Sequence, residues 1–298
     1  MKLGLIGVGN IGQHFAARIL AAGQELVVFD LNKEAQKRCN DLGAEIADSV
    51  VDLASRVESV LLCLPMPAAV QSVVTQAMEG TSLRSLIDLS TTGPSVTKEI
   101  ADMLSPKGIS FVSAPVSGGT VAAKNGTLAV MAAGNQATFR AIEPILKMIG
   151  KNIFYLGADP AMGQTMKIIN NTLYATSMLA SCEALVYGVK AGLDPQTMLD
   201  VVNVSSGRSF ATMERIPAAA LDRSFPVRFT TELLHKDIKM CLDEAEKIGA
   251  PMMVNQAARQ FLAFLLTQGY GSKDNVASMQ QFEQWAGVEF GKAPVSPT

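Results

Sequence analysis

A glycine-rich turn between a short apolar segment and a helical pattern constrains the fold of this chain more than any other feature. The apolar segment is Lys2–Ile6, the turn Gly7–Gly12 reads GxGxxG, and the helical pattern covers Ile11–Ala22. A second apolar segment, Glu25–Phe29, leads directly to Asp30. Glycines are common in turns, so the motif alone is weak evidence. A strand, a glycine turn, a helix and a second strand ending in an acid together predict a dinucleotide-binding unit.

Each glycine of the turn has a separate physical task. Gly7 allows the tight turn, Gly9 lets the backbone approach a pyrophosphate, and Gly12 lets the helix pack closely on the strand. The helix N-terminus adds unpaired N–H groups and a partial positive charge. Asp30 is positioned to accept hydrogen bonds from ribose hydroxyls. The predicted cofactor contacts of this unit are Gly7, Gly9, Asn10, Ile11, Gly12 and Asp30.

The acid at position 30 also predicts which dinucleotide is bound. A 2′-phosphate beside the Asp30 carboxylate is repelled, and a basic residue is needed there instead. The nearest basic residue, Lys33, lies one turn into the next expected helix. The sequence therefore predicts NAD in preference to NADP.

Strand and helix patterns alternate up to about residue 156, and only helical patterns follow. Most of the strand segments are continuously apolar, as in strands that are covered on both faces. The expected strands are Lys2–Ile6, Glu25–Phe29, Ser59–Leu64, Ser85–Leu89, Ile109–Ser113, Thr127–Met131 and Asn152–Leu156. The expected helices are Ile11–Ala22, Lys33–Leu42, Ala68–Met78, Val96–Leu104, Gln136–Ile149, Met162–Ala191, Pro195–Val204, Phe210–Leu221, Thr231–Ile248, Met252–Thr267 and Asp274–Trp285.

This order of elements predicts an α/β N-terminal domain followed by an all-α C-terminal domain. The first, residues 1–160, has a doubly wound, mostly parallel sheet of the Rossmann type. The second, residues 161–298, begins with the long helix Met162–Ala191, which joins the two domains and spans about 45 Å. The last seven residues, 292–298, carry two prolines and are expected to fray.

Composition excludes several classes of function. The 25 basic and 27 acidic residues leave a net charge of −2, and aromatic residues make up only 6% of the chain, which argues against nucleic-acid binding. No apolar run approaches twenty residues and the N-terminus lacks a signal-peptide pattern, so we expect no membrane span. Four cysteines without a CxxC pair indicate reduced thiols and a cytoplasmic protein.

The two histidines, His14 and His235, are too few for a histidine metal site, so no metal is predicted. His14 lies just inside the first helix and is expected to be solvated, and His235 receives no catalytic role. A general acid or base must then be a lysine, a tyrosine, a carboxylate or water.

The long helix offers such a group. Lys167, Asn171 and Tyr174 follow one another at helical spacing among apolar neighbours. A lysine there suits a partly buried cleft, where desolvation lowers its pKa toward the working pH. A lysine whose chain covers apolar surface while its amine reaches water fits the spacing equally well.

Two loops at the carboxyl ends of expected strands are rich in small polar residues. One is Asp88–Pro94 and the other is Ala114–Thr120. Ligands of open α/β sheets bind at this edge. The N–H groups of Ser117, Gly118 and Gly119 could form a nest for a carboxylate, although ordinary connecting turns explain both loops as well.

Taken together, these stretches resemble the β-hydroxyacid dehydrogenase family, which includes 3-hydroxyisobutyrate dehydrogenase and tartronate semialdehyde reductase. The resemblance covers nearly the whole chain, and the order and spacing of its motifs are highly specific. The motifs are the glycine turn, Leu64-Pro65, Asp88–Thr92, Ala114–Gly119, Gly126–Leu128, Gly163-x-x-x-Lys167-x-x-x-Asn171 and Lys236-Asp237. The run Asn203–Arg208 is most similar to the 3-hydroxyisobutyrate branch.

The resemblance implies a role for each matching residue. Lys167 matches the catalytic lysine and Asn171 its supporting amide. Ser117, Gly118 and Gly119 match the loop that holds the substrate carboxylate, with Arg208 as a second clamp. Cofactor contacts beyond the glycine turn are implied for Leu64, Pro65, Thr91 and Lys236. Ile11 replaces a methionine that is usual in the family, and Ser209-Phe210 departs from the 3-hydroxyisobutyrate enzymes, so the substrate stays open.

The expected activity is reversible hydride transfer between NAD and a short β-hydroxy acid, with Lys167 as general acid and base. An alternative is reduction of an aldehyde acid, of the tartronate, succinic or glyoxylic semialdehyde type, with NAD(P)H. A non-catalytic dinucleotide sensor is a further alternative, but such a protein is expected to lose the lysine. Imine reductases usually lack this lysine, and the chain is too short for a 6-phosphogluconate dehydrogenase. The mean hydropathy of +0.24 and the resemblance predict a homodimer or homotetramer.

Overall fold

The chain forms two compact units, which divide between Ile168 and Ile169. The structure is a computed structural model that describes residues 2–291, so the expectation for residues 292–298 lies outside it. The division falls eight residues after the position that the sequence suggested, because the first two turns of the long helix belong to unit 1.

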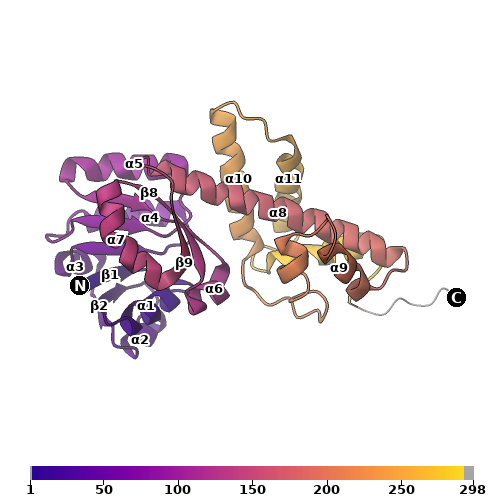
Figure 1. Cartoon of the computed structure of the whole chain (residues 1–298), viewed down its shortest axis with the longest axis horizontal. Helices are drawn as coiled ribbons and strands as arrows, with labels where there is room; N and C mark the ends of the chain where they lie inside the picture. The colour runs from indigo at the N-terminus through magenta and orange to yellow at the C-terminus, as the bar shows by residue number, and fades with distance from the viewer. Residues whose placement is uncertain (1, 292–298) are drawn as a thin grey trace. The chain divides into compact units, whose positions relative to one another are not determined.

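Unit 1 is built on a nine-stranded, mostly parallel sheet with the order β3-β2-β1-β4-β5-β6-β8-β7, with β9 paired to β8 (Figure 1). The strands are β1 (Lys2–Ile6), β2 (Glu25–Phe29), β3 (Glu45–Ile46), β4 (Ser59–Leu62), β5 (Ser85–Asp88), β6 (Ser110–Ser113), β7 (Val116–Ser117), β8 (Leu128–Gly134) and β9 (Gly150–Tyr155). The strand order reverses between β1 and β4, so the carboxyl ends of these two strands mark the switch point where such sheets bind ligands. The predicted doubly wound fold is confirmed.

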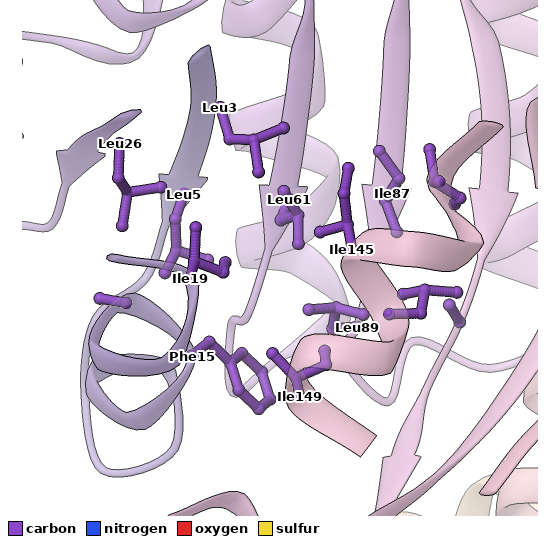
Figure 2. Packing of buried hydrophobic residues seen from close by; sticks show 14 of the residues in the cluster. Leu3, Leu5, Phe15, Ile19, Leu26, Leu61, Ile87, Leu89, Ile145 and Ile149 are labelled. Carbon is purple, nitrogen blue, oxygen red and sulfur yellow. The ribbon is translucent and has the colours of Figure 1, made fainter. Parts of the chain in front are cut away.

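Helices cover both faces of this sheet and bury two separate cores. They are α1 (Gly12–Ala21), α2 (Lys33–Asn40), α3 (Val50–Arg56), α4 (Pro67–Ala77), α5 (Pro94–Leu104), α6 (Gly119–Asn125) and α7 (Gln136–Ile149). Figure 2 shows the ring of Phe15 of α1 beside Ile149 of α7, in the core that also contains the strand residues Leu5 and Leu61. The next residue of β4, Leu62, faces the other core, with α3, α4 and α5. Because both faces of the strands are buried, their sequences are continuously apolar.

Within the residues described, the regular elements of unit 2 are all helices, joined by turns. Its helices are α8 (Ala161–Lys190), whose first eight residues belong to unit 1, α9 (Pro195–Asn203), α10 (Thr231–Lys247), α11 (Met253–Thr267) and α12 (Ser278–Ala286). Helices α10 and α11 lie side by side (Figure 1). Leu234 and Ile238 of α10 pack with Leu262 of α11 and Leu179 of α8 in one core. None of the helices in residues 2–291 combines the length and apolar character needed to span a lipid bilayer.

Several sequence predictions about elements were wrong. The expected helix Phe210–Leu221 is only a π-helical turn, Ala211–Arg215, followed by turns, because Pro217 cannot donate a hydrogen bond within a helix. The stretch Asp274–Trp285 begins with a 3₁₀ turn, Asn275–Ala277, before α12. The short elements β3, α3, β7 and α6 were not anticipated, and β8 runs antiparallel to β6.

Candidate active site

The glycine turn has the geometry that its motif predicts. Gly7 has φ +91°, and a Cβ on it would lie 2.3 Å from the carbonyl oxygen of Cys63. A Cβ on Gly12 would lie 2.0 Å from the carbonyl oxygen of Gly7, so neither position accepts a side chain. A Cβ on Gly9 meets no described atom within 4 Å. The turn is therefore closed on its inner side and open at Gly9, which fits a dinucleotide whose pyrophosphate approaches the backbone there.

Asp30 is tied to this turn by its own side chain. One carboxylate oxygen, Oδ2, accepts the N–H of Val8 at 2.8 Å, and Oδ1 accepts the N–H of Asn32 at 2.8 Å. The Lys33 amine lies 3.4 Å from the side-chain oxygen of Gln36. The acid at the end of β2 is thus fixed beside the glycine turn, where a ribose would be bound.

A second group of polar contacts joins the ends of β4 and β5. The carboxylate of Asp88 is fully buried and accepts the N–H of Ser90 at 2.9 Å and the hydroxyl of Thr92 at 2.5 Å. The Ser90 hydroxyl in turn accepts the N–H of Leu64 at 2.9 Å. These contacts fix the segment that carries Thr91, which is half-buried, next to Leu64 and the exposed Pro65.

The side chain of Gln164 was missed in the sequence and organises this region. It is fully buried in the first turn of α8. Its Oε1 accepts the N–H groups of Thr92 at 2.9 Å and Gly93 at 3.2 Å, and its Nε2 donates to the Ser90 carbonyl and the Ser113 hydroxyl, both at 3.0 Å. One amide thereby holds both the loop after β5 and the end of β6. Only its position within a motif quoted for Lys167 signalled it.

The loop predicted to hold a carboxylate follows β6. Ser117 ends β7 and is half-buried, and Gly118 and Gly119 have φ +131° and +68° at the start of α6. A Cβ on Gly118 would lie 2.6 Å from that of Ala122. Glycine is therefore required at Gly118 for the backbone to turn into the helix.

Lys167 and Asn171 lie one turn apart on α8, and the division between the units falls between them. Lys167 is only 7% exposed. In unit 2 the Asn171 amide donates to Asp237 Oδ2 at 2.6 Å, and the Lys236 amine lies 3.1 Å from Asp237 Oδ1. Asp237 is buried and was named in the sequence only as the neighbour of Lys236. The structure thus brings Asn171 and Lys236 together through a carboxylate.

The remaining candidates differ in their surroundings. Arg208 is exposed and follows α9, with its N–H on the Ser205 carbonyl at 3.4 Å. Burial raises the pKa of Tyr174 to about 12, so this phenol stays neutral near pH 7. Burial lowers the pKa of both His14 and His235. In the described part of the chain, no group of three His, Cys, Asp or Glu side chains could hold a metal ion.

Comparison with known proteins shows to which class of protein the chain is similar. Residues 2–157 match a family model described as the NAD binding domain of 6-phosphogluconate dehydrogenase. Residues 161–282 match one described as NAD-binding of NADP-dependent 3-hydroxyisobutyrate dehydrogenase. These two halves define a class of oxidoreductases that bind a nicotinamide dinucleotide on a sheet domain followed by a helical domain.

Full-length relatives define the family. The chain is 33% identical to 2-(hydroxymethyl)glutarate dehydrogenase of Eubacterium barkeri over 97% of both chains. It is 32% identical to human mitochondrial 3-hydroxyisobutyrate dehydrogenase over 94% of this chain and 86% of that one. It is also similar to the solved structure of Mycobacterium tuberculosis 3-hydroxyisobutyrate dehydrogenase with L-serine, with a TM-score of 0.86, 26% identity and coverage of 94% and 98%. The chain belongs to the β-hydroxyacid dehydrogenase family, as its motifs predicted.

Proposed function

We propose that this protein is an NAD-dependent dehydrogenase of a short β-hydroxy acid, with Lys167 as general acid and base. The observation that carries the proposal is the register of α8. Gln164 holds the loop after β5 and the end of β6, at the carboxyl edge of the sheet where ligands bind. Lys167 follows one helical turn later in a buried position, and Asn171 follows after one further turn.

The proton follows a simple route in this proposal. In oxidation, the neutral amine of Lys167 accepts the proton of the substrate hydroxyl as the carbon–oxygen double bond forms. The bound nicotinamide supplies the hydride acceptor. In reduction, protonated Lys167 returns the proton to the oxygen, so reduction of an aldehyde acid is the same step in reverse. Asn171, held by Asp237, positions the amine or the substrate oxygen.

The substrate carboxylate binds, in this proposal, at Ser117, Gly118 and Gly119, with Arg208 as a second clamp. The names of the relatives designate 3-hydroxyisobutyrate, a monocarboxylic acid, and 2-(hydroxymethyl)glutarate, a dicarboxylic acid. Both classes belong in a panel of hydroxy acids and semialdehydes, assayed by nicotinamide absorbance. The proposed function is wrong if none of these acids is turned over with either NAD or NADP.

For the cofactor we propose NAD over NADP. The first support is the fixed carboxylate of Asp30, whose negative charge disfavours a 2′-phosphate. The second is the contact of the Lys33 amine with Gln36, which occupies the basic group that a 2′-phosphate would need. The remaining contacts proposed for the dinucleotide are the glycine turn, Leu64, Pro65, Thr91 and Lys236. The ratio of kcat/KM for the two cofactors tests this, and equal or better efficiency with NADP contradicts it.

We also propose that the protein is a homodimer or homotetramer. Trp285 is 59% exposed in a group of aromatic rings with Phe261, Phe264 and Phe282. Such apolar surface is more often covered than solvated. Light scattering after size-exclusion chromatography measures the mass, and a monomer at micromolar concentration contradicts the proposal.

A further inference from the structure

Unit 2 contains a buried arginine next to the helix face that carries Asn171. Tyr174 follows Asn171 by three residues on α8, and its hydroxyl accepts the Nε–H of Arg215 at 3.2 Å. The same hydroxyl donates to the side-chain oxygen of Asn275 at 2.6 Å. The ring of Phe210 meets the Tyr174 ring edge-on at 5.9 Å. We name Tyr174, Phe210, Arg215 and Asp274 the Arg215 cluster.

The hydrogen bonds of Arg215 leave part of its guanidinium unused. A guanidinium has five N–H donors. Nε donates to Tyr174, and Nη2 donates to both oxygens of Asp274 at 2.8 and 2.9 Å. Among residues 2–291 none accepts a hydrogen bond from Nη1, while the side chain remains 8% exposed. The contacts of Nε and Nη2 thus hold the plane of the guanidinium, and the two N–H groups of Nη1 have no acceptor among the described residues.

The charge of Asp274 is divided among several donors. Besides Nη2 of Arg215, its carboxylate accepts the N–H groups of Arg228 at 2.8 Å, Phe229 at 3.0 Å and Val276 at 3.0 Å. Tyr174 adds no negative charge near pH 7. These three backbone N–H groups offset part of the negative charge of Asp274. The Arg215 guanidinium therefore keeps positive charge that can stabilise an anion at Nη1.

We infer that Nη1 of Arg215 binds the second carboxylate of a dicarboxylic β-hydroxy acid. The inference rests on the proposed function, which places the hydroxyl-bearing end of the substrate at Lys167 and Asn171. The helical rise from Asn171 to Tyr174 is about 4.5 Å, comparable to a short chain of methylene groups. The ring of Phe210, 58% exposed, supplies apolar surface for those methylenes. A single guanidinium already shared with Asp274 favours a carboxylate over a doubly charged phosphate.

The test compares two substrates that differ by the second carboxylate arm. We expect the wild type to favour 2-(hydroxymethyl)glutarate over 3-hydroxyisobutyrate in kcat/KM with NAD. Arg215→Gln should lower kcat/KM for the dicarboxylic acid about 10–100-fold, the usual effect of losing a hydrogen bond to a charged group. The monocarboxylic acid should change by less than about 3-fold. The ratio of the two values does not depend on how much enzyme is folded.

Arg223→Gln is the matched control, because Arg223 pairs with Glu283 at 2.7 Å elsewhere in unit 2. This control should leave the ratio unchanged. If Arg215→Gln does not fold, Arg215→Lys keeps the charge opposite Asp274 but loses the planar fork, and should shift the ratio in the same direction.

Three results overturn the inference. They are a wild type that favours the monocarboxylic acid, an equal loss on both substrates in the Arg215 variants, and a shifted ratio in Arg208→Gln but not in Arg215→Gln. Failure of the proposed function is distinct, because the wild type then turns over none of the hydroxy acids and semialdehydes of the panel with either NAD or NADP. Turnover of other acids of the panel without turnover of the dicarboxylic acid overturns this inference alone.

Discussion

Lys167 is the residue on which the proposed chemistry depends, and its removal gives the most direct prediction. General acid–base help of this kind contributes about 10²–10⁴-fold. Lys167→Ala should therefore lower kcat by that factor, while the NADH dissociation constant, measured by fluorescence titration, changes little. Lys190→Ala, at the exposed opposite end of α8, is the control and should keep normal turnover. Near-normal turnover of Lys167→Ala would rule out the assignment.

The cysteines give a prediction from pKa. Burial raises the pKa of the thiols of Cys63 and Cys182 to about 12, so at pH 8 only about one thiol in ten thousand is the reactive thiolate. Burial also raises the pKa of Cys39 and Cys241. Iodoacetamide at pH 8 should label the native protein slowly and the urea-unfolded protein rapidly, as measured by mass spectrometry. Rapid labelling of native Cys182 would contradict the pKa.

At this scale the sequence predicted candidate site residues where local spacing signals them. Lys167 and Asn171 are separated by one helical turn, and the glycine turn lies within one short segment. The hydrogen-bond partners of Gln164 lie 51 to 74 positions away, that of Asp237 lies 66 positions away, and those of Arg215 lie 41 and 59 positions away. No local pattern reports such pairs, because the fold alone brings them together.

At the scale of elements, two glycines of the turn between β1 and α1 should differ in what they affect: Gly9 the binding of NADH, and Gly12 the stability of the fold. Gly9→Ala meets open space, so its thermal stability should stay near that of the wild type while its affinity for NADH falls. Gly12→Ala places a methyl group against the Gly7 carbonyl and should destabilise the fold by about 1–3 kcal/mol. Calorimetry and NADH titration of the two variants measure the contrast. Equal stability losses would contradict the geometry of the turn.

Gln164 joins α8 to two loops, and its loss should affect stability and turnover together. Gln164→Met keeps the volume but leaves Thr92 N–H, Gly93 N–H and the Ser113 hydroxyl without their partner. Unsatisfied buried groups cost about 1–3 kcal/mol each, so we expect a total loss of about 2–5 kcal/mol in the urea unfolding of unit 1, which contains Gln164. The exposed Gln284→Met is the control. An unchanged unfolding free energy of unit 1 would show that the four hydrogen bonds of Gln164 do not stabilise it.

Long elements were predictable because the apolar pattern of a helix repeats over several turns, and a buried strand is a run of several consecutive apolar residues. Strands β1 and β2 and helix α7 have the predicted bounds. The two-residue strands β3 and β7 are too short to carry a period, and α6 begins at Gly119, a residue that suggests a loop. The π-helical turn at Ala211–Arg215 has an apolar pattern like that of a helix, which Pro217 interrupts.

At the scale of the whole molecule, the two units have separate cores. The clusters around Leu3 and Ile6 belong to unit 1, and those around Met178 and Leu262 belong to unit 2. Among the elements of residues 2–291, α8 alone has residues in both units. Separate cores favour separate unfolding transitions, so a single free energy of unfolding is not expected to describe the protein.

A dinucleotide whose proposed contacts, apart from Lys236, all lie in unit 1 should therefore stabilise the two units unequally. NADH at 100 times its dissociation constant stabilises a binding unit by about 2.7 kcal/mol. In hydrogen exchange measured by mass spectrometry at rising urea, amides of β1, β4 and β5 should become more protected with NADH, while those of α12 stay unchanged. The Gly9→Ala variant, with its weaker affinity, should show a smaller effect at the same NADH concentration. Equal protection of α12 would mean that α8 couples both cores into one cooperative unit, and that binding at the glycine turn is felt throughout the chain.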